Sequence, residues 1–419
     1  MSPALNGELS VPGDKSISHR ALILGAMAEG RTYIDHLSEG EDVRSTWRCL
    51  RAMRVDVTAD AGRVAIKGSR WRGLLSPKRD LNAGNSGTTM RLLMGVIAGS
   101  DVMARLDGDA SLRGRPMKRV AEPLRLMGAD VYMKDGEHAP VTIRGAALKG
   151  IDFKSPVASA QLKSAVLLAG LLAIGETSVT EPELSRDHTE RLLPVFGAKI
   201  SRVGLKVTVR GGLNLSGSRV IVPGDPSSAA FWVVAATLAP GSVLTLRGVS
   251  LNPTRLGFVA ALTRMGAIIE AQGKDEIAEP SGDLRVRSAK LHAADIAASE
   301  VPGLIDEIPI LALAASQADR TSRFSGLAEL RHKESDRLAA VAELLTALGG
   351  DARVEGDALV VTGPRRLRAA KVDSRGDHRL AMTAMIAGLV ADGTVVVSDE
   401  ECVKISYPSF IADLRRLTA

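Results

Sequence analysis

Gly13-Asp14-Lys15-Ser16 opens the first of six segments in which a short polar loop runs into a helix-like stretch of small and apolar residues. The next openings begin 71, 72, 68, 79 and 72 positions further along the chain. They read Gly84-Asn85-Ser86-Gly87-Thr88, Pro156-Val157-Ala158-Ser159-Ala160-Gln161, Gly224-Asp225-Pro226-Ser227-Ser228, Gly303-Leu304-Ile305-Asp306-Glu307 and Arg375-Gly376-Asp377-His378-Arg379. Ser, Thr, Asp, Asn and Gly are preferred at helix N-termini, which attract anions through free N–H donors and partial positive charge. If the six starts converge, they predict a site for a strongly anionic small ligand.

The repeat extends beyond each opening helix. A β-rich stretch such as 177–180 follows, then an amphipathic helix that ends in Gly, as at Leu124-Arg125-Leu126-Met127-Gly128, and then alternating strands such as 206–210 and 358–362. The unit therefore reads strand–helix–strand–helix–strand–strand, and its length of about 70 residues exceeds the period of common solenoids. The last copy ends after its second helix and residues 7–11 supply a strand, so we expect both chain ends in one domain.

Two identical tetrapeptides, Val11-Pro12-Gly13-Asp14 and Val222-Pro223-Gly224-Asp225, stand three units apart. We interpret them as crossings between two domains of three units each, although two ordinary turn sequences are the alternative. On this interpretation residues 1–13 and 225–419 form one discontinuous domain, and residues 14–224 form the other.

Composition limits the classes of function. The chain has 419 residues, 45% hydrophobic and only 3% aromatic, so its cores must be aliphatic. The net charge is +6, but Lys and Arg are spread along the chain and stacking aromatics are scarce, which argues against nucleic-acid binding. Anionic metabolites explain the basic excess better.

Targeting signals are not evident. The apolar stretch 162–174 is interrupted by Lys163 and is too short to span a membrane, and no signal peptide is recognisable. The two cysteines, Cys49 and Cys402, form no metal or redox motif. We therefore expect reduced thiols and a cytoplasmic location.

Cationic residues accompany several of the loops. Lys15, Ser16 and Arg20 can surround a phosphate or a carboxylate at one helix start, although a capped helix with solvated cations is the alternative. Arg115, before a proline, suits bidentate capture of the same groups. The second loop lacks the spacing of a nucleotide-binding P-loop, and Gly87 allows a ligand close to the backbone.

The run from Arg331 to Arg337 is densely charged. On a helix, Lys333 and Arg337 would share one face and repel each other, which suggests an anion between them, and Glu334 could act as an acid or a base. Asp306 and Glu307 open a strongly apolar helix, where helix capping is the alternative to a role in chemistry.

Together these motifs resemble the 5-enolpyruvylshikimate-3-phosphate (EPSP) synthase family, over essentially the whole chain. The resemblance rests on six motifs in order, and Ser159-Ala160-Gln161 and 185–190 are similar to its class II branch. The motifs are Lys15-Ser16-x-x-His19-Arg20, Gly84-Asn85-Ser86-Gly87-Thr88, Arg115-Pro116-Met117, Ser159-Ala160-Gln161, Lys333-Glu334-Ser335-Asp336-Arg337 and Asp377-His378-Arg379.

The resemblance implies the two-domain enolpyruvyl transferase fold, an inside-out α/β barrel with six β-α-β-α-β-β repeats, three per domain, and an active site in the cleft between the domains. It implies transfer of the enolpyruvyl group of phosphoenolpyruvate to the 5-hydroxyl of shikimate 3-phosphate, with release of phosphate. It implies a monomer that needs no metal and no organic cofactor.

Site residues follow from the same resemblance. Asp306 would accept the hydroxyl proton and Glu334 would protonate carbon 3, with the division of roles among Lys15, Asp306 and Glu334 left open. The shikimate 3-phosphate ligands would be Lys15, Ser16, Arg20, Ser159, Ala160, Gln161, Arg186, Asp306 and Lys333. The phosphoenolpyruvate ligands would be Lys15, Gly87, Arg115, Gln161, Arg337 and Arg379.

Two further expectations concern the phosphoenolpyruvate site. Many class I members carry a ligand Lys where this chain has Ile405, with Lys404 one position earlier, so a contact between Lys404 and the ligand is left open. Glyphosate, the family's inhibitor, occupies this site, and Gly87 should leave room for it where tolerant class II members can carry Ala.

Two alternatives remain at this stage. The sister enzyme that transfers enolpyruvate to UDP-N-acetylglucosamine typically has a Cys on the loop corresponding to 107–116, and this chain has none there. A non-enzymatic clamp built of repeated domains would not need the charged motifs at 333–337 and 377–379.

Overall fold

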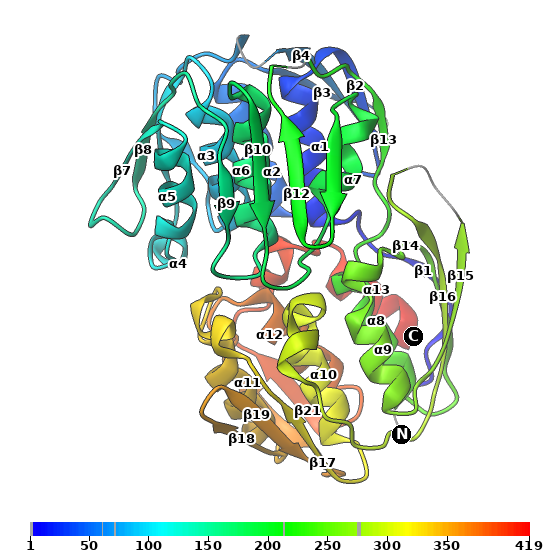
Figure 1. The fold of residues 1–419 in the computed structure, drawn as a ribbon. Helices are drawn as coiled ribbons and strands as arrows, with labels where there is room; N and C mark the ends of the chain where they lie inside the picture. Colours follow the sequence, from blue (N-terminus) through cyan, green and yellow to red (C-terminus); the bar gives the residue numbers. More distant parts are fainter. Residues whose placement is uncertain (1–2, 61, 71–72, 213, 275–277) are drawn as a thin grey trace. The chain divides into compact units, whose positions relative to one another are not determined.

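The computed structural model describes residues 3–60, 62–70, 73–212, 214–274 and 278–419. The chain divides into two compact units (Figure 1). Unit 1 comprises Met1–Pro12 and Pro223–Ala419, and unit 2 comprises Gly13–Val222. Each unit is described by itself below.

Unit 2 holds three copies of the repeat. The first is α1 (Lys15–Met27), β2 (Glu29–Asp35), α2 (Glu41–Ala52), β3 (Asp56–Asp60) and β4 (Arg63–Ser69). The second is β5 (Leu81–Asn82), α3 (Gly87–Ala98), β6 (Met103–Asp107), α4 (Ala110–Arg113), α5 (Lys118–Leu126), β7 (Asp130–Met133) and β8 (Val141–Arg144). The third is β9 (Asp152–Lys154), α6 (Ala160–Leu172), β10 (Glu176–Thr180), α7 (His188–Val195), β11 (Ile200–Val203) and β12 (Lys206–Arg210), followed by β13 (Arg219–Ile221).

Unit 1 begins with β1 (Asn6–Ser10) and continues with α8 (Pro226–Leu238), β14 (Val243–Ser250), η2 (Pro253–Arg255), α9 (Gly257–Arg264), β15 (Ile268–Lys274) and β16 (Ser281–Arg287). The fifth copy is η3 (Ala298–Gly303), η4 (Ile305–Glu307), α10 (Ile308–Ser316), β17 (Thr321–Phe324), η5 (Ala328–His332), α11 (Arg337–Ala347), β18 (Asp351–Glu355) and β19 (Ala358–Thr362). The sixth is β20 (Arg368–Val372), α12 (His378–Ala387), β21 (Asp392–Val397), η6 (Glu400–Ile405) and α13 (Phe410–Thr418).

The sheets repeat one strand order. Four sheets read β13-β2-β4-β3, β5-β6-β8-β7, β9-β10-β12-β11 and β1-β14-β16-β15, with the first pair parallel and the other two pairs antiparallel. The fifth copy keeps β17-β19-β18 and reduces its leading strand to a bridge between Ile296 and Phe324, and the sixth pairs β20 with β21. The strands thus form separate sheets in the described part of the chain and do not close into a barrel.

The leading strands of the first and fourth copies are exchanged. β1 precedes α1 in the chain but pairs with β14, whereas β13 precedes α8 but pairs with β2. Both exchanges occur at the Val-Pro-Gly-Asp segments, where the chain passes from one unit to the other. Gly13 is required at the first passage, because an added Cβ would lie 2.0 Å from the carbonyl oxygen of His36.

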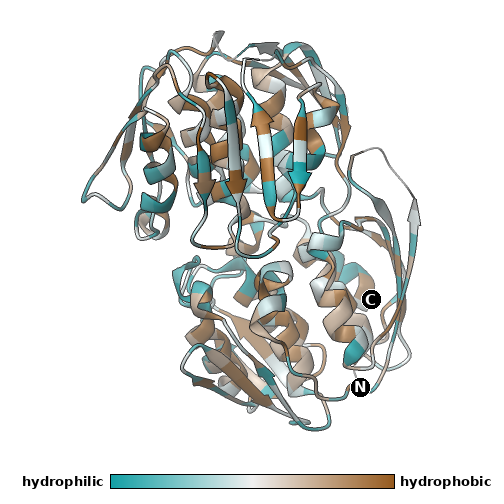
Figure 2. Ribbon diagram, in the orientation of Figure 1, coloured by the Kyte–Doolittle hydropathy of each residue, from teal (hydrophilic) through white to brown (hydrophobic). Residues whose placement is uncertain are grey.

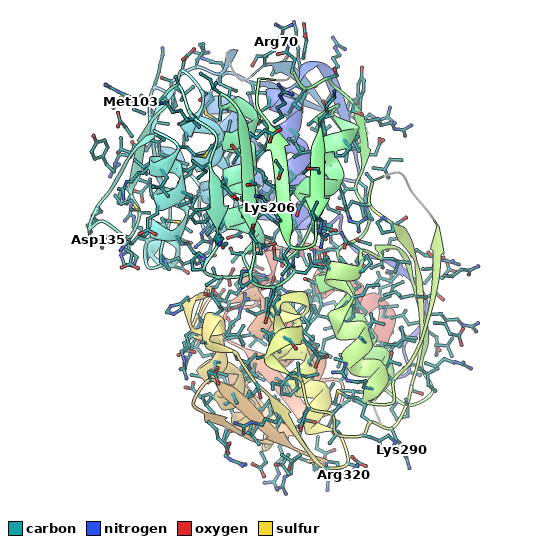
Figure 3. All side chains as sticks on the ribbon, in the orientation of Figure 1. Arg70, Met103, Asp135, Lys206, Lys290 and Arg320 are labelled. Atoms are coloured by element: carbon teal, nitrogen blue, oxygen red, sulfur yellow. The ribbon has the colours of Figure 1, made fainter. Side chains whose placement is uncertain are left out.

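The first helix of each copy is buried almost all round. In α1 every residue from Ile17 to Met27 is buried, and in α10 every residue is. Helices of this kind form the brown interior of each unit in Figure 2. In unit 2, β10 and β12 pack on α6 (Figure 1), while side chains such as Met103 and Asp135 point outward at the edge (Figure 3).

An aromatic cluster fastens the end of the chain inside unit 1. The Trp232 ring on α8 lies 5.1 Å from Phe410, and its Nε1–H donates to the Tyr407 hydroxyl at 3.1 Å. The Tyr407 hydroxyl donates in turn to Asp413 at 3.0 Å. Because α13 also packs against β1, both ends of the described chain lie in unit 1. Among the described residues no helix combines the length and apolarity needed to cross a membrane.

Close contact between α3 and α6 provides a test of this packing. A Cβ on Gly95 would lie 2.2 Å from the backbone oxygen of Ala165. Overpacking costs about 1–3 kcal/mol, more than the roughly 1 kcal/mol that Ala gains over Gly in helix propensity. We expect Gly95→Ala to lower the urea midpoint of unfolding, measured by circular dichroism. The control Gly114→Ala adds a Cβ no closer than 3.5 Å to its neighbours and should leave the midpoint unchanged; equal midpoints for both variants would contradict the packing described.

Candidate active site

The helix starts of unit 2 are capped by side chains. Asp14 accepts a hydrogen bond from the N–H of Ile17, and Ser86 and Ser159 cap α3 and α6 in the same way. Beyond the first turn these helices are buried. Their N-terminal turns are therefore the parts of α1, α3 and α6 that a ligand can reach.

Lys15 and Arg20 lie on the first turns of α1 and are held differently. The Lys15 ammonium donates to Asp42 Oδ2 at 2.8 Å. Arg20, almost fully buried, donates from Nη1 to the carbonyl of Ser16 at 2.9 Å. Asp42 belongs to α2, and nothing in its sequence surroundings marks it as a partner of Lys15.

The rest of the Arg20 guanidinium contacts the third copy. Nε donates to Thr189 Oγ1 at 2.7 Å and Nη2 donates to Ser164 Oγ at 2.7 Å. The two hydroxyls are also hydrogen-bonded to each other at 2.7 Å. The first and third copies thus fix the direction of Arg20 together.

A chain of hydrogen bonds joins the first copy to the second. His19 Nδ1 lies 2.7 Å from Thr46 Oγ1, which lies 2.7 Å from Thr89 Oγ1, and the Thr89 hydroxyl donates to Ser86 Oγ at 2.8 Å. Ser86 is the residue that caps α3. The buried imidazole therefore helps to place the second helix start relative to the first.

Burial and positive charge act together on His19. Desolvation, with the nearby charges of Lys15 and Arg20, holds the pKa of His19 well below its usual range. The imidazole is therefore neutral at neutral pH. It serves as a hydrogen-bonding partner and adds no charge to the site.

Gln161 brings the second and third helix starts together. Its amide donates to Thr88 Oγ1 at 2.8 Å and accepts from Arg91 Nη1 at 2.6 Å. Arg115 donates to the side-chain oxygen of Asn85 at 2.7 Å. Arg91 was assigned no role from the sequence. Its place one helical turn after Gly87 is the signal that could have found it.

Gly87 gives room to these two guanidinium groups. A Cβ at this position would lie 2.8 Å from Arg91 Nη1 and 3.5 Å from Arg115 Nη1. Ser159, Ala160 and Gln161 are half-buried at the start of α6, and Arg186, also half-buried, stands two residues before α7.

In unit 1, Asp306 and Glu307 are not caps of a regular helix. Both lie in the 3₁₀ turn η4, and α10 begins only at Ile308. Glu307, at the N-cap position, makes no capping hydrogen bond with its side chain. The capping alternative is therefore wrong for these two carboxylates.

Three cations from two further loops converge on Asp306. Lys333 Nζ donates to Oδ1 at 3.2 Å, and Arg337 Nη1 donates to the same oxygen at 3.4 Å. Arg379 lies 3.8 Å from Oδ2 and donates to the backbone oxygen of Asp306 at 3.0 Å. The structure thus brings together Asp306, Lys333, Arg337 and Arg379, which the motifs had singled out separately.

The helical interpretation of the charged run is wrong. α11 begins at Arg337, because Asp336 caps it by accepting from the N–H of Ala339 at 3.1 Å, so Lys333 and Glu334 precede the helix. The expected anion between Lys333 and Arg337 is present, but it is Asp306 of the protein itself.

Arg337 is fully buried and has two more carboxylate partners. Nη2 lies 2.5 Å from Glu334 Oε2, while Nε donates to Asp377 Oδ2 at 2.7 Å. Asp377 also caps α12 by accepting from the N–H of Arg379 at 3.0 Å. Burial is the largest influence on the pKa of Asp377 and opposes its ionisation, whereas the charge and the hydrogen bonds of Arg337 favour it. The combined effect lowers the pKa of the carboxyl below its usual value.

The fourth helix start is linked by hydrogen bonds to the ion-pair group around Asp306 and Arg337. Asp225 caps α8, and Arg255 Nη2 donates to Asp225 Oδ1 at 3.0 Å and to Ser227 Oγ at 2.8 Å. The Ser227 hydroxyl donates to buried Glu307, whose Oε1 lies 3.9 Å from Arg379 Nη1. The sequence had assigned this start no chemical role, and the link through Glu307 depends on tertiary structure.

Lys404, Cys49 and Cys402 contact Glu401, Asn82 and Ser374, which are not members of this ion-pair group. Lys404 is more than half exposed and pairs with Glu401. Both cysteines are free and buried, and burial raises the pKa of Cys49 to about 12 and that of Cys402 to about 11. Among the described residues, no group of three or more His, Cys, Asp or Glu side chains is arranged to hold a metal ion.

Comparison with known proteins identifies the family. Residues 1–414 match the model of the family described as EPSP synthase (3-phosphoshikimate 1-carboxyvinyltransferase). The 3-phosphoshikimate 1-carboxyvinyltransferase of Synechococcus sp. (strain JA-3-3Ab) is 52% identical, with 100% of this chain and 96% of that protein covered. The enzyme of the same name from Geobacillus thermodenitrificans is 48% identical, with 99% and 97% covered.

Solved structures of EPSP synthases support the same family assignment. An EPSP synthase from Acinetobacter baumannii superposes with a TM-score of 0.88 at 40% identity, covering 100% of this chain and 96% of that one. The resemblance read from the motifs and the predicted fold class are confirmed, with the difference that the sheets stay separate.

The buried pair of Arg337 and Asp377 provides a stability test. A carboxyl whose pKa is lowered on folding stabilises the protein above its unfolded pKa, near 3.8, and loses that contribution as pH falls through the folded value. Removing one partner of a buried ion pair costs about 3–5 kcal/mol. We expect Asp377→Asn to lower the free energy of unfolding by that order at pH 7, and by less at pH 3, in urea titrations.

An exposed pair is the control for this measurement. Asp351 pairs with Arg365 at 2.8 Å, with both side chains more than a third exposed. Asp351→Asn should cost less than about 1 kcal/mol at either pH. A loss for Asp377→Asn no larger than this, or one that grows below pH 4, would contradict the electrostatic account of Asp377.

Proposed function

The chain belongs to the EPSP synthase family, and we propose that the cationic groups described above hold the two anionic substrates of that family's reaction. The enzyme transfers the enolpyruvyl group of phosphoenolpyruvate to the 5-hydroxyl of shikimate 3-phosphate and releases phosphate, in the shikimate pathway. The convergence of Lys333, Arg337 and Arg379 on Asp306 is the single observation that most supports the proposed site.

Shikimate 3-phosphate is bound, in this proposal, mainly by the first turns of α1 and α6. Arg20 supports this assignment, because its guanidinium is directed by three hydrogen bonds before any ligand is present. A pre-oriented guanidinium binds phosphate with little loss of side-chain entropy. The full set is Lys15, Ser16, Arg20, Ser159, Ala160, Gln161, Arg186, Asp306 and Lys333.

In this proposal the phosphoenolpyruvate ligands are Lys15, Gly87, Arg115, Gln161, Arg337 and Arg379. In unit 2, Arg91 is added as a positioning residue because it donates to the side-chain oxygen of Gln161. In unit 1, the substrate phosphate or carboxylate would meet Arg337 and Arg379, whose positions are set by Asp377 and Asp306.

The reaction needs proton transfers and the stabilisation of negative charge. Carbon 3 of phosphoenolpyruvate takes a proton, and the 5-hydroxyl loses its proton as its oxygen attacks carbon 2. The tetrahedral adduct then loses phosphate together with a proton from carbon 3, which restores the carbon–carbon double bond. Asp306 takes the hydroxyl proton, with Lys333 beside it, and Glu334 delivers the proton to carbon 3. Both carboxyl side chains are slightly exposed, at 14% and 15%, which supports their access to substrate.

We further propose a monomer that works in the cytoplasm and is inhibited by glyphosate. The two free, buried cysteines suit a reducing compartment. Glyphosate carries a phosphonate and a carboxylate, so the cations proposed for phosphoenolpyruvate suit it as well.

Phosphate release tests the function and the role of Asp306 together. We expect release from phosphoenolpyruvate only when shikimate 3-phosphate is present. Loss of a general base costs about 10²–10⁴-fold, so Asp306→Asn should lower kcat at least about a hundredfold. The exposed Asp319→Asn is the matched control and should retain full activity. Full activity of Asp306→Asn, or release without shikimate 3-phosphate, would contradict the proposal.

Glyphosate inhibition tests the place of Gly87. We expect competitive inhibition against phosphoenolpyruvate at millimolar inhibitor. In Gly87→Ala the new Cβ displaces the Arg91 guanidinium, 2.8 Å away, and narrows the site, so the inhibition constant should rise at least about tenfold, or 1.4 kcal/mol. Gly114→Ala should leave it unchanged. Equal inhibition constants for Gly87→Ala, Gly114→Ala and the wild type would contradict the proposal that Gly87 leaves room for glyphosate.

A further inference from the structure

Lys163 is a fully buried cation for which the reaction has no use. It lies on α6 with 1% of its side chain exposed. Its ammonium donates to Glu181 Oε2 at 2.6 Å and lies 2.7 Å from Glu190 Oε1. Both carboxylates are buried as well. Buried charges are rare and costly, and apolar residues of similar size often stabilise a core equally well. Stability alone therefore does not explain why Lys163, Glu181 and Glu190 are buried together.

The two carboxylates stand at the ends of one segment. Glu181 directly follows β10, and Glu190 lies in the first turn of α7. Ser185, between them, donates its hydroxyl to Glu181 Oε1 at 2.5 Å. One ammonium thus fastens both ends of residues 181–190 to α6, and Arg186 lies within this fastened segment.

The same two helices supply the acceptors for Arg20. Ser164 follows Lys163 on α6, and Thr189 precedes Glu190 on α7. Their hydroxyls, 2.7 Å apart, take the Nη2–H and Nε–H of Arg20. A shift of α7 along α6 would separate the two hydroxyls and release the guanidinium.

We propose that Lys163 is a positioning residue for shikimate 3-phosphate. By holding Glu181 and Glu190, it sets the register of α7 and of the segment carrying Arg186 against α6, and so directs Arg20 and Arg186 toward the bound substrate. Apolar packing alone would tolerate sliding of these elements, whereas an ammonium shared by two carboxylates demands one geometry. The assignment of Arg20 and Arg186 to this substrate rests on the proposed function.

Substitution of Lys163 by Met in the full chain tests the proposal. Misplacement of a substrate-positioning side chain by about 1 Å can lower the efficiency of an enzyme up to about a hundredfold. We therefore expect Lys163→Met to raise KM for shikimate 3-phosphate at least about tenfold. KM for phosphoenolpyruvate should change less than about threefold, since Arg115, Arg337 and Arg379 do not depend on this cluster. Lys163→Arg, which keeps the charge, should recover part of the loss. Glu190→Gln should act in the same direction and carries the test if Lys163→Met does not fold.

Two control variants separate positioning from general destabilisation. Val166→Ala opens a cavity three residues further along α6, where Val166 is fully buried. Lys206 lies on β12 (Figure 3), and Lys206→Met breaks its exposed ion pair with Asp152 of β9. Both should leave KM for shikimate 3-phosphate unchanged. An unchanged KM in folded Lys163→Met, or an equal rise in Val166→Ala, would overturn the proposal.

Calorimetric titration with shikimate 3-phosphate measures substrate binding without catalysis. It therefore distinguishes a failure of the positioning role of Lys163 from a failure of the proposed function. If the wild type binds shikimate 3-phosphate but releases no phosphate, the proposed function fails, while the ratio of dissociation constants between wild type and Lys163→Met still tests the positioning role. We expect that ratio to match the change in KM. Equal dissociation constants in the two proteins would overturn the role of Lys163.

Discussion

The structure depends on the burial of the first helix in each repeat. An apolar helix that packs on all sides can offer chemistry only at its ends, where four N–H groups lack partners within the helix. In unit 2, Lys15, Thr88 and Gln161 are partly accessible on first turns whose continuing helices are buried. The same constraint that builds the core therefore decides where a ligand can be bound.

Anion binding of this kind requires cations that are already in place. Carboxylates and carbonyls of the protein hold them: Asp42 holds Lys15, Asp377 holds Arg337, and the backbone oxygen of Asp306 holds Arg379. Because these groups are ordered before substrate arrives, the cost of ordering them is not added to the cost of binding. Asp306 receives three such cations, from Lys333, Arg337 and Arg379.

Periodicity and turn chemistry in the sequence predicted the repeats well. The capping residues Asp14, Ser86, Ser159, Asp225 and Asp377 all cap helices as their types suggest. The helix expected through Lys333 was wrong, because Asp336 is the stronger start signal and the preceding residues turn toward Asp306 instead. Local preference decided these capped helix starts, but it could not say which neighbour a charged side chain would contact.

The sequence by itself determined the repeating unit, the positions of its capped helix starts and the residue types offered there, because these depend on backbone propensity within a few residues. Only the tertiary structure decided which strands β1 and β13 pair with, and the roles of Asp42, Arg91, Glu307 and Lys163 as partners, because these contacts join residues distant in the chain. The strength of these polar contacts depends on how deeply they are buried, and a pattern of residues along the chain does not specify burial.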